Sequence, residues 1–224
     1  MAIARLDSAS SSTSTSFSYT VSSGTDRLLV VTVMAGAGSG TPNVSGITYG
    51  GQSLTEALRN AYDNIDVEIW YLDDAGIAAA SGSTVSVSYS SGQDEDSYAA
   101  ASYTGVDQTT PVSETNSDGN GGSPNPATGH DVTEADGNLV VSAGCVEGVG
   151  SQTWHSDLTE QTGFTGGNIS SSMADRLSST GGNVSCELTW GSSGTQSLVS
   201  VEFAQASGGG GSVVPIIHQQ HMAA

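Results

Sequence analysis

Lysine is absent from this chain of 224 residues, and its basic residues are the arginines Arg5, Arg27, Arg59 and Arg176. They stand against 23 aspartates and glutamates, so the formal net charge is -19. Nucleic-acid binding requires a cationic surface that neutralises phosphates, and we therefore expect no nucleic-acid partner. The composition indicates either a plain acidic, self-repelling surface or a halophilic source, because the Debye length falls to about 3 Å in high salt.

Cysteine is scarce as well, with only Cys145 and Cys186 in the chain. Both fall in segments that we predict to be strands, and two buried free thiols are the preferred interpretation over a disulfide. Neither cysteine has the spacing of a metal-binding motif. The sequence therefore predicts no metal centre built on cysteine.

The chain has no apolar run of the roughly 20 residues that a membrane-spanning helix requires, so we expect no membrane insertion. Residues 1–7 lack the charged and apolar regions of a signal peptide. Yet the Ser, Thr, Gly and acid content, with Asn-x-Ser sites at Asn43, Asn168 and Asn183, is typical of an extracellular β protein. A virion component, assembled in the host cytoplasm and released with the particle, reconciles these features. The alternative is a signal outside this sequence.

Short alternating runs of apolar and polar residues are what the sequence does contain. The stretch 25–72 organises them, with buried runs at 26–34 and 66–72 around a Tyr-Gly-Gly turn at 49–51. The glycines supply the positive φ angles that a tight reversal needs. We count about twelve strands and no long helix, which predicts an antiparallel two-sheet sandwich, closer to a jelly roll than to an immunoglobulin domain. No internal repeat is evident in the sequence.

The chain divides into three parts by composition. Residues 1–16 form a Ser/Thr-rich lead-in, residues 17–206 form the sandwich domain, and residues 207–224 form a Gly-rich linker with an apolar tail. A tethered apolar segment favours docking, because leaving it in water forgoes about 25 cal/mol per Å². The alternative is an engineered remnant. The predicted assembly tail is Val213, Val214, Pro215, Ile216 and Ile217.

Trp154 is the candidate for ligand recognition at the surface, because it lies in a polar segment. Asp118 and Asn120 join it as candidates, since they fall in the longest predicted loop, at 107–129.

Asp94, Glu95 and Asp96 are adjacent acids that could hold a structural Ca²⁺, although solvated acids are the plainer interpretation on an acid-rich protein. No Gly-x-Ser-x-Gly elbow lies between a strand and a helix. The sequence therefore predicts no catalytic residue, no enzyme, and no cofactor besides this Ca²⁺.

Four motifs in a fixed order resemble a β-sandwich family found in tailed-phage structural proteins and metagenomic surface proteins. The resemblance covers most of residues 15–205. The motifs are DRLLVV (26–31), VSGITYGGQSLT (44–55), EIWYL (68–72) and SYTGVDQTTP (102–111).

The resemblance implies a non-enzymatic virion structural protein: a capsid decoration, a turret or a fibre-type subunit. It would assemble as a homo-oligomer through its termini and contact other capsid or tail subunits. Together with the missing lysine, it indicates a virus of a halophilic host, such as a haloarchaeal tailed virus. Two alternatives stay open: a glycan-binding adhesin at a tail tip or cell surface, whose partners are host surface glycans, and a cell-surface filament subunit.

Overall fold

The computed structural model describes residues 2–92, 94–121, 129–191 and 194–207. These residues form seventeen strands, all paired antiparallel, and one short helix, which confirms the predicted all-β class. The elements are β1 (Ala4–Ser12), β2 (Ser16–Ser18), β3 (Leu28–Gly36), β4 (Asn43–Tyr49), β5 (Gln52–Ser53), β6 (Thr55–Tyr62), β7 (Ile65–Leu72), α1 (Asp74–Ala79), β8 (Thr84–Ser91), β9 (Glu95–Thr104), β10 (Val112–Asn120), β11 (Gly129–Glu134), β12 (Leu139–Glu147), β13 (Gln152–Trp154), β14 (Thr159–Gly166), β15 (Ile169–Leu177), β16 (Gly182–Trp190) and β17 (Gln196–Phe203).

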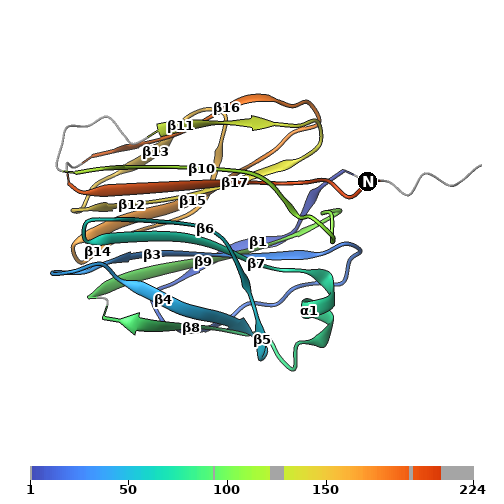
Figure 1. Ribbon diagram of the computed structural model, residues 1–224, viewed down its shortest axis with the longest axis horizontal. Coiled ribbons are helices and arrows are strands. Elements are labelled where there is room, and N and C mark those ends of the chain that lie inside the picture. Colours follow the sequence, from blue (N-terminus) through green and yellow to red (C-terminus); the bar gives the residue numbers. More distant parts are fainter. Residues whose placement is uncertain (1, 93, 122–128, 192–193, 208–224) are drawn as a thin grey trace, which may run out of the picture.

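The strands form four stacked layers (Figure 1). The first layer has the order β2-β8-β4-β5 and the second β1-β9-β3-β7-β6. The third has the order β10-β17-β12-β15-β14 and the fourth β11-β16-β13. Three separate apolar clusters fill the spaces between successive layers. The molecule is therefore two sandwiches packed on each other, where the sequence predicted one.

Each sandwich has the strand order of a jelly roll. In the first, β1-β9-β3-β7 and β2-β8-β4 are the two sheets, and the chain changes sheets at Leu54. There β5 ends its short pairing with β4, and β6 begins beside β7. The second sandwich repeats this order with β10-β17-β12-β15 and β11-β16-β13. We call residues 4–106 the first module and residues 112–206 the second module.

Equivalent positions in the two modules share residues and local geometry, so the expectation of no internal repeat is wrong. The segment Leu54-Thr55-Glu56 recurs as Leu158-Thr159-Glu160, and both leucines are buried. A register shift follows the glutamate in each copy, between Glu56 and Leu58 and between Glu160 and Thr162. The repeat is not detectable from the sequence, because the two modules share few other identical residues at equivalent positions.

The two modules face each other about an approximate two-fold axis. Strand β10 packs against β6 as β1 packs against β14, and β17 packs against β7 as β9 packs against β15. Side chains follow the same rule. The rings of Tyr71 and Phe203 meet edge to face with centroids 6.0 Å apart. The equivalent pair is Asp175 and Tyr103, whose hydroxyl donates a hydrogen bond of 2.7 Å to the carboxylate of Asp175. This interface encloses the largest apolar cluster of the molecule.

The central strands explain why the sheets stack twice. Strand β3 is buried along its whole length, and β12 is buried up to its final glutamate. Both sequences are apolar on successive residues, as expected for a strand that is covered on its two faces. Alternate side chains of β3 therefore enter two different cores: Leu28 and Val30 contact the second module, while Leu29 and Val31 contact the outer sheet of their own module.

Two segments that the sequence assigned to loops are strands. The lead-in 1–16 contains β1, which pairs with β9, and the loop 107–129 contains β10, which pairs with β17. Both are edge strands whose residues are only partly buried, so their sequences are polar and lack the alternation that marks a half-buried strand. This is the main reason that the prediction of about twelve strands is too low.

The two cysteines lie in different apolar clusters, one on each side of the sheet that contains β12. Cys145 belongs to the cluster between the modules and Cys186 to the outer cluster of the second module, and both thiols are free. The prediction of buried free thiols is therefore confirmed. Among the described residues, no helix is long and apolar enough to cross a membrane.

Candidate functional site

Trp154 is a core residue, which overturns its prediction as a surface recognition residue. Only 8% of it is exposed, and it packs in the apolar cluster of the second module. Its indole Nε1 donates a hydrogen bond of 2.8 Å to the Ser172 hydroxyl. The polar residues next to Trp154 in the sequence face outward from a short strand. Its polar sequence neighbours therefore predicted an exposed side chain where the structure has a buried one.

Asp118 and Asn120 lie on the edge strand β10, far from Trp154 in the fold. Strands β17 and β12 separate β10 from β15, the strand that Trp154 contacts. The Asp118 carboxylate accepts a hydrogen bond from the backbone N–H of Gly119. The backbone carbonyl of Asp118 accepts a 2.7 Å hydrogen bond from the side-chain amide of Asn60. The structure therefore does not bring the three predicted ligand-binding residues together.

The three adjacent acids of the predicted Ca²⁺ site have three different partners. Asp94 accepts the N–H of Gly38, and Asp96 accepts the hydroxyl of Tyr98. Glu95 accepts two hydrogen bonds from Asn168 in the other module. Among the described residues, no group of three His, Cys, Asp or Glu side chains is placed to hold a metal ion. The predicted assembly tail, Val213–Ile217, lies outside the described residues.

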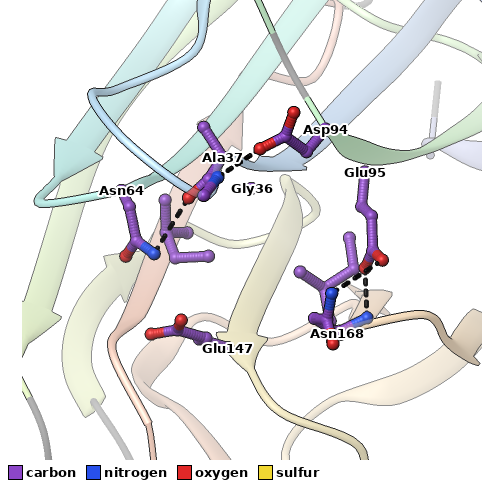
Figure 2. A pocket seen from close by; sticks show the side chains of 10 residues that line it. Gly36, Ala37, Asn64, Asp94, Glu95, Glu147 and Asn168 are labelled. Carbon is purple, nitrogen blue, oxygen red and sulfur yellow. Dashed lines mark hydrogen bonds between the residues drawn. The ribbon is translucent and has the colours of Figure 1, made fainter.

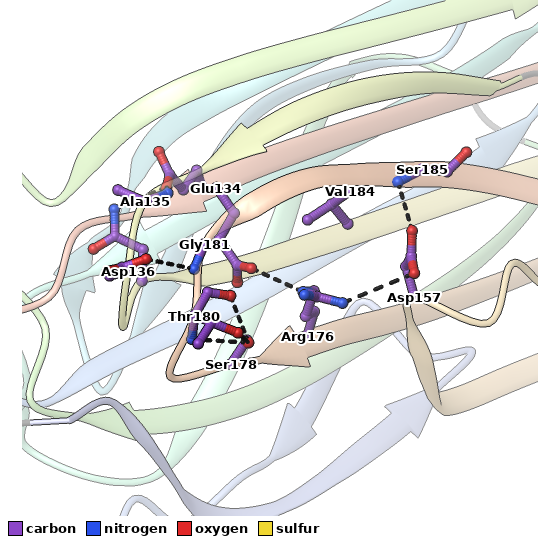
Figure 3. A network of polar contacts seen from close by, with 12 residues as sticks. Glu134, Ala135, Asp136, Asp157, Arg176, Ser178, Thr180, Gly181, Val184 and Ser185 are labelled. Atoms are coloured by element: carbon purple, nitrogen blue, oxygen red, sulfur yellow. Dashed lines mark hydrogen bonds and ion pairs between the residues drawn. The ribbon is translucent and has the colours of Figure 1, made fainter.

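All four arginines are used in ion pairs within the chain. Arg27 pairs with Asp74, and Arg5 pairs with Asp175 across the module interface. Figure 3 shows Arg176 between Glu134, which it contacts over 2.8 Å, and the more distant Asp157. Only five of the 23 acids are buried, so the other 18 lie at least partly in solvent. The surface therefore carries excess negative charge without a free arginine among the described residues.

The fourth arginine, Arg59, is paired with two fully buried carboxylates in the first module. Asp66 and Glu68 lie two residues apart on β7, so both side chains point from the same face into the space between the first two layers. Arg59 Nη2 donates to Asp66 over 2.8 Å, and its Nε lies 3.2 Å from Glu68. The Trp70 indole N–H donates to the second oxygen of Glu68.

One guanidinium cannot fully offset two carboxylates that are removed from water. Burial, reinforced by the charge of Asp66, raises the pKa of Glu68 to about 8. Burial also raises the pKa of Asp66, although its hydrogen bonds with Arg59 oppose the shift. Below about pH 8 the pair therefore retains a proton. The sequence contained a signal for this pair, since two acids alternate with apolar residues in a strand that was expected to be buried.

A cavity of about 120 Å³ lies at one end of the interface between the modules (Figure 2). Equivalent residues of the two modules line it: Asn64 and Asn168 end the turns before β7 and β15, and Ile65 and Ile169 begin those strands. The cavity therefore lies on the approximate two-fold axis. The sequence did not predict this cavity, because its walls come from five separate turns and strand ends of a repeat that was not recognised.

The polar groups of the cavity are mostly acceptors. The Asn64 amide nitrogen donates to the Ala37 carbonyl over 3.1 Å, which leaves the buried amide oxygen of Asn64 without a partner. The Asn168 amide nitrogen donates to Glu95 over 3.1 Å. Asp94, Glu95 and Glu147 bring three carboxylates to the lining, and no basic side chain is among the described residues that line it.

No known protein family, no curated protein and no solved structure matches this chain.

Proposed function

We propose that this protein is a non-enzymatic structural subunit of an extracellular particle that works in high salt, with a virion decoration, turret or fibre as the leading assignment. The observation that carries the proposal is the charge arrangement: every arginine is paired inside the chain, while 18 of the 23 acids are at least partly exposed. Such a surface is strongly self-repelling in dilute buffer and is screened in concentrated salt.

The fold supports a structural role. Two jelly rolls share a continuous apolar interface, and jelly rolls are common in viral capsid and lectin domains. Four of the five buried carboxylates, Asp66, Glu68, Glu134 and Asp175, are engaged in ion pairs with arginines, and the pair of Asp175 with Arg5 joins the two modules. This arrangement favours a rigid building block, and it supports the expectation that the protein is not an enzyme, which stays a prediction.

The adhesin alternative has less support than the structural role. Its aromatic platform was Trp154, which is buried, and the large apolar side chains that are exposed among the described residues are Tyr62, Val149 and Leu177. A glycan-binding platform requires an exposed aromatic face. The ring of Tyr62 is partly covered, because it lies against Gly119 of β10 and against Gly121, the residue after β10's end.

Assembly through the tail is the part of the proposal that concerns residues 207–224. The three apolar clusters of the described residues lie within residues 3–203, and the apolar run at 213–217 is outside the described part of the chain. We propose that it docks on a second copy or on another particle subunit.

Quantitative mass spectrometry of particles purified from the source tests the function. We expect tens to hundreds of copies per particle for a decoration or turret, and a handful for a tail component. Recovery from cell envelopes, with none in particles, would contradict the virion assignment and favour a cell-surface filament.

Sedimentation in concentrated salt tests the tail separately. The full chain should form a homo-oligomer, and a variant that ends at Ser207 should be monomeric. The same oligomer in both would contradict docking through the tail without affecting the virion assignment.

A further inference from the structure

We propose that the outer face of the first module, the solvent side of β2, β8 and β4, is a self-association surface that binds the same face of a second copy of this chain. Such a contact rests on the homo-oligomeric role proposed above, but it uses no part of the tail. Four properties of the face carry it: its lack of charge, its hydroxyl groups, its small side chains and its size.

The outer face of the first module carries no charge. None of the strands β2, β4, β5 and β8 contains Asp, Glu, Lys, Arg or His. The outer sheet of the second module differs, because Asp131 and Glu187 point outward from β11 and β16. The chain has a net charge of -19, so contact between two copies through their acidic surfaces brings carboxylates together. Contact through the outer face of the first module avoids this repulsion.

Hydroxyl groups cover this face. Apolar residues of the sheet, such as Val85 and Ile47, point into the core of the first module, so the residues between them face outward from the outermost layer (Figure 1). Those that carry a hydroxyl are Ser16, Ser18, Ser45, Thr48, Thr84, Ser86 and Ser88. A hydroxyl both donates and accepts hydrogen bonds, whereas a carboxylate only accepts them. A hydroxyl-covered face is therefore complementary to a copy of itself, which an acidic face is not.

The small side chains of the face are in register across its strands. Ser86 lies at the centre, directly opposite Ser16 of β2 and Thr48 of β4. Ser88 is paired with Gly46, where an added Cβ would meet no atom within 4 Å. Short side chains lose little conformational entropy when they are buried. In an isologous dimer the same patch of both copies meets about a two-fold axis, which places β8 over β8 because this strand lies between β2 and β4.

The face is small, so the contact should be weak by itself. Strands about 4.8 Å apart, at about 3.3 Å per residue over the 8 residues of β8, give roughly 350 Å² per copy. A stable interface buries about 800 Å² per partner. We therefore expect a dissociation constant on the order of 1 mM for the face alone, and tighter contact where another site already holds the copies together.

Cross-linking of the full chain through introduced thiols tests the contact. Ser88→Cys places a thiol on the middle strand of the face, and Thr153→Cys places one on the outer sheet of the second module as the matched control; both residues are exposed. Cys145 and Cys186 are buried, so a short bismaleimide should react with the folded protein only at the introduced thiol. At about 1 mM protein in concentrated salt, we expect about tenfold more cross-linked dimer for Ser88→Cys than for Thr153→Cys.

A charge variant tests the same surface without a cross-linker. Ser88→Asp adds a carboxylate that faces its own copy across the contact, so it should lower the average mass of the full chain in sedimentation equilibrium at this concentration. Thr153→Asp adds the same charge outside the face and should leave that mass unchanged. Because both residues are exposed, both variants should fold, and their urea unfolding curves check this.

Three results would overturn the proposal. They are equal cross-linking of the two cysteine variants, equal effects of the two aspartate variants, and cross-linking of Ser88→Cys in intact particles to a different protein only. The first would indicate collisions without a specific surface, the second general repulsion between acidic copies, and the third a face that binds another subunit. Each could occur with particle copy numbers as expected above, so failure of this contact is distinguishable from failure of the proposed function.

Discussion

The buried carboxyl of Glu68 should make the free energy of unfolding depend on pH, and Glu68→Gln should remove that dependence. The pKa of Glu68 is raised from an ordinary 4.5 to about 8, chiefly by burial. The folded state therefore holds a proton that the unfolded state releases. This favours folding fully below about pH 4.5, and the contribution is lost as the pH rises toward 8.

The expected magnitude follows from linkage. One proton held by the folded state alone changes the free energy of unfolding by at most about 1.4 kcal/mol per pH unit. Glutamine cannot release a proton, and its amide oxygen can still accept from Trp70. Between about pH 5 and pH 8, Glu68→Gln should therefore gain on the order of 3 kcal/mol in stability relative to the original chain, below the ceiling of about 4 kcal/mol.

Urea unfolding at fixed salt, followed by tryptophan fluorescence at several pH values, measures this difference. Glu56→Gln is the control, because this exposed glutamate lies on the neighbouring strand β6, directly opposite Trp70 in the pairing of β6 with β7. Its stability curve should run parallel to that of the original chain. A stability difference between Glu68→Gln and the original chain that stays constant over this pH range would refute the reasoning.

Three further predictions concern charge, the core and the thiols. Raising NaCl from about 0.1 M to about 1 M shortens the Debye length from about 10 to about 3 Å and should raise the melting temperature. An unchanged or lower melting temperature in calorimetry would contradict a self-repelling surface. Trp154→Ala should lower the free energy of unfolding by about 3–5 kcal/mol in urea titrations, whereas Val149→Ala, at a residue 55% exposed, should change it by less than about 0.5 kcal/mol. Equal effects of the two substitutions would contradict the burial of Trp154. Burial raises the pKa of both Cys145 and Cys186, so Ellman's reagent should label neither thiol in the folded protein and both after unfolding, and rapid labelling of the folded protein would contradict their burial.

The central strands could be predicted because their signal is local. The run 28–31 is apolar on successive residues, and it forms the middle of a sheet that is covered on both faces. A jelly-roll-like sandwich was also expected from the strand spacing, although as one sandwich and not two. The edge strands β1 and β10 could not be found in this way, because pairing on one side only leaves their side chains free to be polar.

The candidate sites were harder to predict because they depend on contacts between distant segments. Trp154 was assigned from its polar sequence neighbours, and its burial depends on Ser172 and on the outer sheet of the second module. The cavity joins Asn64 to Asn168 through a symmetry that only the fold reveals. The one available clue was the repeated Leu-Thr-Glu segment, and it is too short to establish a repeat by itself.

The face-to-face packing of the two modules creates the apolar interface, the ion pair of Arg5 with Asp175 and the cavity. Nuclear Overhauser contacts between the rings of Tyr71 and Phe203 test it directly, because these rings meet at 6.0 Å and lie in different modules. With three phenylalanines and seven tyrosines in the chain, selective labelling of the two residue types makes the assignment practical. The account predicts strong cross-peaks between these rings. Their absence, with intact contacts inside each module, would contradict the packing.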